Sequence, residues 1–124
     1  MITAIANGSG EQALKLYYDL LSLREPPMRI LALISRQFNL LLQVKELAQK
    51  GYPQAMIGEK VGLHGFIAGK YMKQASGFKV PFLKQALEDC AQTEYAFKSG
   101  KLGERMSVEL LIVKYSSRNR NRTL

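Results

Sequence analysis

The chain contains one cysteine, one histidine and no tryptophan, and it has no long uninterrupted apolar run. With Cys90 alone, no disulfide can form within the chain, which favours a cell interior. The longest apolar candidate, residues 30–47, is interrupted by charged and amide side chains, whereas a membrane span needs roughly 18–20 consecutive apolar residues. The first ten residues lack the basic and apolar regions of a secretory signal. A soluble protein without membrane contact is therefore expected.

The scarcity of histidine and cysteine also limits catalysis and metal binding. His64 has no second histidine or cysteine at metal-ligand spacing, so a capping or surface role is predicted. Cys90 lies on an apolar stripe and is predicted to be a core residue. Glu88 and Asp89 would point about 100° apart on a helix and are predicted to be solvated. With no glycine-rich phosphate motif either, we expect no catalytic, cofactor-binding or metal-binding residue and no enzyme activity.

The residues that are present fit one folded domain. Hydrophobic residues make up 47% of the 124, enough for a packed core, and no low-complexity segment interrupts them. The net charge is +8, from 18 Lys and Arg against 10 Asp and Glu. Such a charge favours contact with nucleic acid or with acidic protein faces, and it does not choose between them.

Proline and glycine divide the sequence into an all-α bundle of about five to six helices, and no stretch alternates as a strand would. A short helical end is expected over residues 1–6. Ser9 and Gln12 have the spacing of a capping box for the next helix, which Glu25 and the following prolines end. Further helices are expected over 27–50, 54–61, 65–75, 81–99 and 104–117. We expect a helical domain over 1–117 and a basic, disordered tail over 118–124.

The helix over 27–50 is apolar around most of its circumference, which predicts a central helix covered by other helices or by a partner. Its solvent-exposed stripe is predicted to be Arg29, Arg36, Gln43 and Lys50. On the helix over 81–99, the residues predicted to face inward are Leu83, Ala86, Leu87, Cys90 and Phe97. The last helix carries the apolar residues Met106, Leu110, Leu111, Val113 and Tyr115.

Glu94 falls on the same stripe as these core positions. A charge that faces the core should be paired, and Lys98 at i+4 or Arg105 could pair with it. We interpret Glu94, Lys98 and Arg105 as an ion pair that fixes how the last two helices meet. The alternative is that Glu94 is presented to a partner subunit.

Residues 54–78 have the spacing of a helix-turn-helix motif around Gly62. The second helix, however, lacks Arg, Asn and Gln in its first turns, where base-reading side chains would lie. An αα-hairpin with a glycine turn is therefore favoured. A basic helix-turn-helix DNA-binding module remains the alternative, with these side chains on phosphates: Lys70, Lys73, Lys79, Arg118, Arg120 and Arg122.

Several segments together resemble the C-terminal domain of the delta subunit of bacterial DNA polymerase III. They are ILALISRQF (30–38), LLLQVKEL (40–47), HGFIAGKYMKQA (64–75), EYAFKSGKL (94–102) and ELLIVKY (109–115). The likeness extends in order from about residue 13 to residue 115. One departure is Gly65, where the family tends to have proline. Glycine there, with Gly69 in mid-helix, predicts a less regular helix.

The resemblance implies a non-catalytic collar domain of a clamp loader, the complex that places the sliding clamp on primed DNA. In the family this helical bundle joins gamma/tau and delta-prime subunits, while the clamp contact and the AAA+ fold lie upstream. The chain would then be a fragment of a subunit of the DNA polymerase III holoenzyme, with DNA contacted indirectly. We expect subunit contacts on the helix over 27–50 and on the last helix, and a location in the bacterial cytoplasm at the nucleoid-associated replisome.

Overall fold

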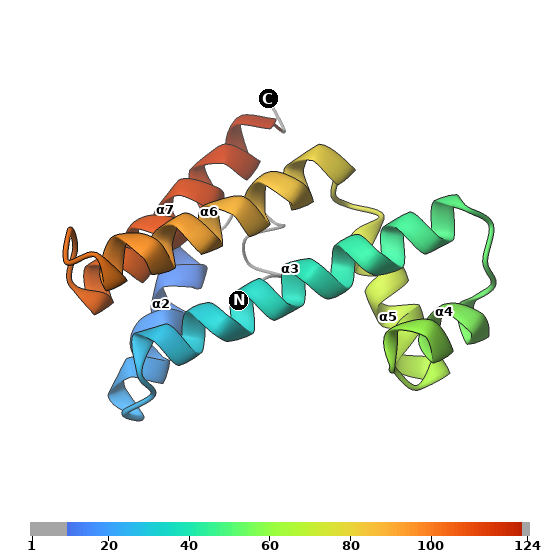
Figure 1. The fold of residues 1–124 in the computed structure, drawn as a ribbon, viewed down its shortest axis with the longest axis horizontal. Helices are drawn as coiled ribbons and strands as arrows, with labels where there is room; N and C mark the ends of the chain where they lie inside the picture. The colour runs from blue at the N-terminus through green and yellow to red at the C-terminus, as the bar shows by residue number, and fades with distance from the viewer. Residues whose placement is uncertain (1–9, 123–124) are drawn as a thin grey trace. The chain divides into compact units, whose positions relative to one another are not determined.

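A computed structural model describes the backbone of residues 10–122 and the side chains of residues 10–115. Within that range the chain forms six helices and no strand (Figure 1), which confirms the all-α prediction. The helices are α2 (Gly10–Ser22), α3 (Pro27–Gln49), α4 (Gln54–Val61), α5 (Gly65–Ala75), α6 (Val80–Lys98) and α7 (Glu104–Arg122). No helix among the described residues is long and apolar enough to span a membrane. The helical end expected over 1–6 and the Ser9 cap lie outside the described residues.

The helix ends follow the glycine and proline positions closely. Helices α4 and α5 have the predicted bounds, and Gly62 between them takes a left-handed φ of 77°. Gly51, with φ of 90°, follows α3. Glycine adopts this region without the steric cost that a Cβ imposes, which is why these turns stop the helices there.

The end of α2 differs from the prediction. The helix stops at Ser22, and Arg24 takes a left-handed φ of 64°. The Glu25 N–H then bonds back to the carbonyl oxygen of Leu20 at 3.2 Å, which closes the helix end as a Schellman-type turn. Arginine can adopt this conformation at a steric cost. Since residues 20–25 contain no glycine, the sequence did not predict the turn.

The last helix, α7, extends to Arg122, which is beyond the end predicted near residue 117. The side chains of 116–124 and the backbone of 123–124 lie outside the described residues. The proposed division into a domain over 1–117 and a tail over 118–124 therefore stays a prediction. Helix α6 begins and ends one residue earlier than predicted.

The helices are distributed over two units, and the boundaries fall within α3 and α6. The first unit comprises residues 1–35 and 88–124. Its helices α2 and α7 pack together, and the Tyr17 hydroxyl donates to the Arg105 carbonyl oxygen at 2.8 Å. The Glu104 carboxylate accepts the Met28 N–H at 3.1 Å, so α7 caps an otherwise unpaired donor in the first turn of α3. Its buried apolar residues are Ala13, Tyr17, Ile30, Leu31, Ile34, Cys90, Val108, Leu111, Ile112 and Tyr115.

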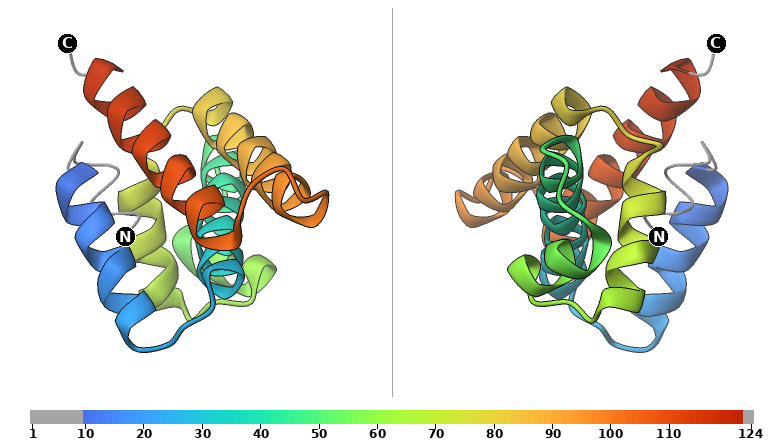
Figure 2. Two further views of the ribbon diagram at one scale, coloured as in Figure 1. Left: turned by 90° about the vertical axis from the view of Figure 1, so that its left-hand side faces the viewer. Right: turned by 90° about the vertical axis from the view of Figure 1, so that its right-hand side faces the viewer.

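The second unit comprises residues 36–87 and contains the predicted αα-hairpin of α4 and α5 (Figure 2). Close approach of these helices depends on Gly58, which is buried. A Cβ at Gly58 would lie 2.7 Å from the Leu63 carbonyl oxygen and 3.3 Å from the Ala68 Cβ. At Gly69 the missing Cβ leaves room for Gln54, whose amide donates to the Gly65 carbonyl oxygen at 2.8 Å.

The rest of the second unit is held by an aromatic cluster and a polar bond to α3. The Phe78 ring packs edge-on against Phe38 and stacks on Phe82. The Tyr71 hydroxyl donates to the Gln37 side-chain oxygen at 3.1 Å, which ties α5 to the second half of α3. The buried apolar residues of this unit are Phe38, Leu40, Leu41, Leu42, Val44, Ile57, Ala68, Ala75, Phe78, Phe82, Leu83 and Ala86.

The predicted faces of α3 and α6 are largely confirmed. All four members of the expected polar stripe of α3 are exposed: Arg29, Arg36, Gln43 and Lys50. On α6, Leu83, Ala86 and Cys90 are buried, whereas Leu87 and Phe97 are half-buried. Leu33 is an exception to the apolar burial of α3, because 55% of it is exposed.

Candidate interaction surface

An apolar stripe runs along the outer side of α7. Met106, Leu110 and Val113 are 49%, 49% and 44% exposed, and their spacing of four and three residues puts them on one helix face. We call these three residues the α7 stripe. Leu102, 39% exposed, lies just before α7 begins. Together these four residues form an exposed apolar surface, which is typical of a site of protein interaction.

The sequence placed these apolar residues on the last helix and predicted subunit contacts on that helix, without assigning a face to each residue. In the structure Leu111 and Tyr115 are buried, and Val108 and Ile112 complete the buried face. Apolar residues thus occupy both sides of α7, and only one of these two apolar faces is buried within the chain.

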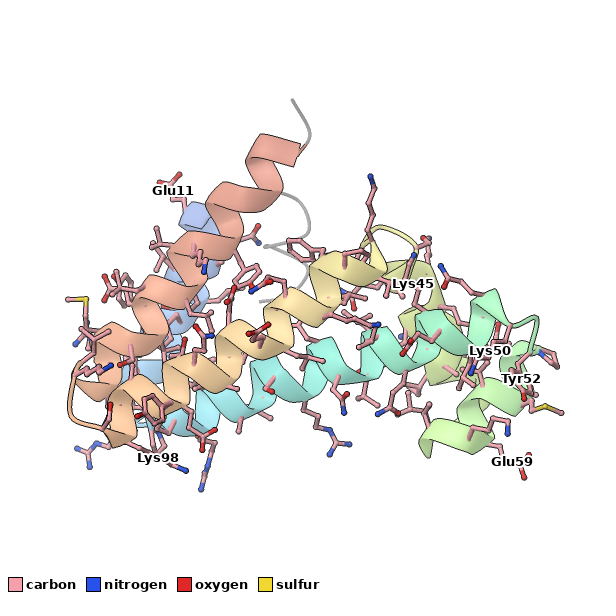
Figure 3. The ribbon with its side chains drawn as sticks, turned by 45° about the horizontal axis from the view of Figure 1, so that its top comes forward. Glu11, Lys45, Lys50, Tyr52, Glu59 and Lys98 are labelled. Carbon is pink, nitrogen blue, oxygen red and sulfur yellow. The ribbon has the colours of Figure 1, made fainter. Side chains whose placement is uncertain are left out.

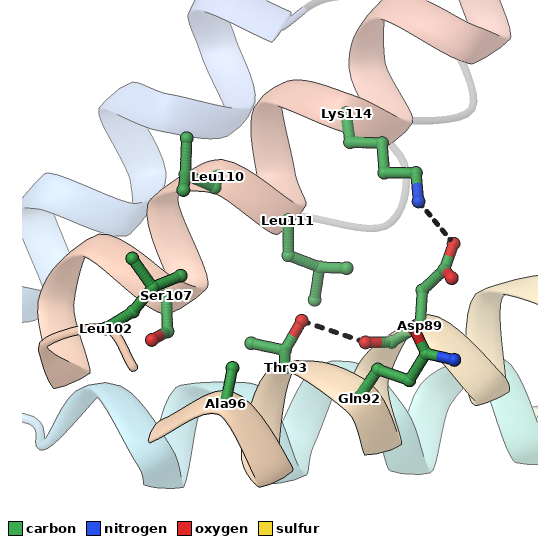
Figure 4. Close-up of a pocket in the computed structure, with 9 residues that line it drawn as sticks. All are labelled: Asp89, Gln92, Thr93, Ala96, Leu102, Ser107, Leu110, Leu111 and Lys114. Atoms are coloured by element: carbon green, nitrogen blue, oxygen red, sulfur yellow. Dashed lines mark hydrogen bonds and ion pairs between the residues drawn. The ribbon is translucent and has the colours of Figure 1, made fainter. Parts of the chain in front are cut away.

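A groove between α6 and α7 adjoins the α7 stripe (Figure 4). It has a volume of about 190 Å³. Its apolar lining comes from Ala96, Leu102, Leu110 and Leu111, and Gln92 and Thr93 add polar groups. The groove is therefore a mostly apolar hollow beside the α7 stripe, of a size that can receive a large apolar side chain.

A buried carboxylate lies at one end of this groove. Asp89 is 6% exposed, and it accepts a hydrogen bond from the Tyr115 hydroxyl and an ion pair from Lys114 Nζ at 3.2 Å. The Thr93 hydroxyl donates to the Asp89 carbonyl oxygen at 2.8 Å (Figure 4). The prediction that Asp89 is solvated is wrong, because α7 supplies partners that compensate for its burial. The position of Asp89, three residues after Ala86 on the buried face of α6, is the feature of the sequence that could have predicted its burial.

Glu94 and Lys98 form the predicted i,i+4 ion pair, with 2.6 Å between Oε1 and Nζ. Lys98 lies at the C-terminal end of α6 (Figure 3). Half of the Glu94 side chain and 68% of the Lys98 side chain are exposed, so the prediction that Glu94 faces the core is wrong. Arg105 instead lies over the Tyr18 ring, with its guanidinium carbon 5.5 Å from the ring centroid. Whether this group contacts a partner subunit stays a prediction.

Tyr18 and its neighbour Tyr17 connect α2 to α7 near Arg105. The Tyr18 hydroxyl donates to Glu109 at 2.8 Å, and this bond raises the pKa of Tyr18. Burial raises the pKa of Tyr17 to about 12, with the Glu109 carboxylate as a second cause. Both side chains are therefore held in the neutral phenol form, and they tie α2 to the first two turns of α7.

The lysines of the alternative DNA-binding hypothesis belong to the second unit. Lys70, Lys73 and Lys79 are all exposed. Arg118, Arg120 and Arg122 belong to the first unit, and their side chains lie outside the described residues. The two groups of basic residues therefore belong to different units.

The histidine and the cysteine have the structural positions predicted for them. His64 is the N-cap of α5, and its Nδ1 accepts the Phe66 N–H at 3.3 Å. Cys90 is buried, and burial together with the Asp89 charge raises the pKa of its thiol to about 12. In the part of the chain that the structure describes, no group of three or more His, Cys, Asp and Glu residues could hold a metal ion.

Comparison with known proteins agrees with this architecture. The family model described as DNA polymerase III delta subunit, C-terminal domain, matches residues 1–115. The chain belongs to this family. DNA polymerase III subunit delta of Bacillus subtilis is 36% identical over 119 residues, which are 96% of this chain and 34% of that protein.

A solved structure supports the same assignment. The Bacillus subtilis DNA clamp loader delta protein matches with a TM-score of 0.88 and 36% identity, over 94% of this chain and 34% of that one. The all-α fold is therefore that of a clamp-loader delta C-terminal domain. The chain spans about a third of the length of these relatives, so it corresponds to one part of a delta subunit.

Proposed function

We propose that this domain joins a delta subunit to gamma/tau and delta-prime subunits in the collar of a DNA polymerase III clamp loader. The observation that carries the proposal is the α7 stripe next to the groove between α6 and α7. An exposed apolar helix face beside a hollow is typical of a surface that a partner helix covers.

The chemistry of the surface defines the partner. About half of Met106, Leu110 and Val113 is exposed, and a partner that covers these side chains would remove this exposed apolar area from water. The charges at its edges are largely compensated, since Lys98 pairs with Glu94 and Lys114 pairs with Asp89, so apolar contact supplies the binding energy. The domain supplies binding energy and orientation and no chemistry of its own. The subunit as a whole then acts as a non-catalytic accessory of the polymerase in the bacterial cytoplasm.

Contact with the sliding clamp is assigned to parts of the subunit outside these residues, and contact with duplex DNA arises through the assembled loader. The alternative, a helix-turn-helix that reads duplex DNA, has less support. The exposed side chains in the first turn and a half of α5 are Phe66, Ile67 and Lys70. Lys70 alone among them can contact a base edge, and no Arg, Asn or Gln lies there.

The test is reconstitution. The chain is mixed with gamma/tau and delta-prime subunits of the same organism, and the mixture is run by size exclusion with light scattering at moderate and at high salt. Assembly through apolar faces predicts co-elution with fixed stoichiometry at both salt concentrations, and a negative heat-capacity change of binding. The proposal is wrong if the chain elutes alone while the other subunits assemble.

A further inference from the structure

The groove between α6 and α7 differs in chemistry from one end to the other. Leu102 and Leu110 line one end, and Asp89, Gln92 and Lys114 line the other (Figure 4). A side chain that fills the groove therefore meets apolar surface along most of its length and polar groups at one end. This pattern defines the chemistry of the residue that fits there.

Two polar groups at the polar end can still bind a ligand. The Lys114 ammonium pairs with Asp89 at 3.2 Å, and because half of its side chain is exposed it can donate further bonds. The Gln92 amide is exposed, and it has no hydrogen-bond partner among the described residues. The Thr93 and Ser107 hydroxyls, by contrast, donate to backbone oxygens four residues earlier at 2.8 Å. A residue that covers Gln92 and Lys114 must supply a hydrogen-bonding group, since their desolvation otherwise opposes binding.

The charges of the groove favour a neutral side chain. Asp89 and Lys114 neutralise each other, and the Tyr115 hydroxyl also donates to the Asp89 carboxylate. A carboxylate placed beside them would be repelled by Asp89, and a cation would compete with Lys114 for it. The groove therefore selects against charged residues as well as against purely apolar ones.

Tyrosine is the residue that meets these conditions. Its ring is apolar, and its hydroxyl can both donate and accept a hydrogen bond. Leucine, methionine and phenylalanine would leave the Gln92 amide without a partner. The indole N–H of tryptophan only donates, so it could not accept a bond from Lys114.

We propose that the groove receives a tyrosine side chain from a helix of a neighbouring subunit. The ring packs on Ala96, Leu110 and Leu111, and the phenol hydroxyl bonds with Gln92 and Lys114. This inference rests on the proposed function, because the helix that covers the adjoining α7 stripe supplies the tyrosine. A tyrosine enclosed in a pocket commonly carries a large share of the binding free energy of an interface.

The side-chain analogue p-cresol tests the groove without any partner. It is titrated into the isotope-labelled chain, and the backbone amide resonances are followed by NMR. The resonances of Gln92, Thr93 and Leu110 should shift, with the weak affinity expected of so small a molecule. Gln92→Leu should weaken p-cresol binding roughly five-fold, the loss of one neutral hydrogen bond, and should not weaken binding of toluene, which has the same ring without the hydroxyl. Gln43→Leu, at an exposed glutamine of α3, is the matched control and should change neither affinity.

A double-mutant cycle in the assembly tests the partner residue. Each tyrosine of gamma/tau and delta-prime that assembly covers is replaced by phenylalanine, and binding to the unsubstituted chain and to Gln92→Leu is compared. One such substitution should weaken binding to the unsubstituted chain roughly five-fold and have no further effect on Gln92→Leu.

The proposal is overturned if p-cresol shifts no resonance of the groove, if Gln92→Leu weakens toluene binding as much as p-cresol binding, or if no partner tyrosine couples to Gln92. Failure of the chain to assemble would contradict the proposed function, and p-cresol binding does not depend on assembly. Normal assembly without p-cresol binding would contradict the tyrosine site alone.

Discussion

The Tyr115 hydroxyl on α7 donates a hydrogen bond to the Asp89 carboxylate on α6, and both side chains are buried. Lys114, the residue before Tyr115, pairs with the same carboxylate from the more exposed side. Two consecutive residues of α7 therefore compensate one charge on α6. This contact links the two helices that form the groove.

The contributions of these two partners are expected to differ. Tyr115→Phe removes a buried hydrogen bond to a charged group and should lower the free energy of unfolding by about 1.5–3 kcal/mol. Lys114→Met should cost less than about 1 kcal/mol, since about half of the lysine side chain is solvated. Urea unfolding of the two variants measures both values. Equal destabilisation would mean that the ion pair holds the carboxylate as strongly as the tyrosine does.

Gly58 and Gly65 offer a matched pair of substitutions to alanine in the αα-hairpin. Alanine at Gly58 would place its Cβ against the Leu63 backbone oxygen, so a loss of about 1–3 kcal/mol is expected. Alanine at Gly65 meets open space at the start of α5 and should stabilise the chain by about 0.4–1 kcal/mol. Thermal unfolding followed by circular dichroism compares them. A stabilising alanine at Gly58 would contradict the close approach of α4 and α5.

Cys90 should be nearly inert in the folded chain. Burial raises the pKa of its thiol to about 12, so little thiolate exists at neutral pH, and the side chain is also inaccessible. Iodoacetamide should label it slowly in buffer and rapidly in urea. Since the chain has only this cysteine, mass spectrometry gives the labelled fraction directly. Rapid labelling under native conditions would show that Cys90 is not part of a packed core.

Tyr17 should make the chain sensitive to alkali. Its pKa is raised from 10 to about 12 in the folded state, so folding favours the protonated phenol. Its stabilising contribution is therefore complete below pH 10 and is lost as the pH rises towards 12. Tyr17→Phe should lower stability at neutral pH by about 1 kcal/mol through the lost hydrogen bond, and should weaken the decline at high pH.

Unfolding free energies between pH 8 and pH 11.5 or so measure this difference, over the range in which the linkage acts. Tyr95→Phe is the control, because Tyr95 is mostly exposed. An unchanged alkaline decline in Tyr17→Phe would assign the decline to other groups.

Helix positions could be predicted from the sequence because their ends depend on local chemistry. Glycine at left-handed φ and proline at helix starts act within a few residues, so α4 and α5 were predicted with their observed bounds. The end of α2 was not predicted because Arg24 takes the left-handed conformation that glycine usually supplies after a helix.

The faces of the helices were predicted less well, because they depend on packing between distant residues. Asp89 was expected in solvent and Glu94 in the core, and the reverse is found. Periodicity alone does not reveal that Tyr115 reaches Asp89 from another helix. The α7 stripe has the same apolar character as the buried face of α7, so composition could not tell which face stays open.

If the α7 stripe forms the contact with neighbouring subunits as proposed, Leu110→Asp should disrupt that contact. Leu110 belongs to the α7 stripe and lines the groove, so a carboxylate there should weaken assembly with gamma/tau and delta-prime by on the order of ten-fold or more. Leu23→Asp is the control, because Leu23 is 74% exposed and lies in the turn after α2. Light scattering of the reconstituted mixtures should show loss of the complex for Leu110→Asp alone. A complex as stable with Leu110→Asp as with the unsubstituted chain would show that the α7 stripe is not the subunit contact.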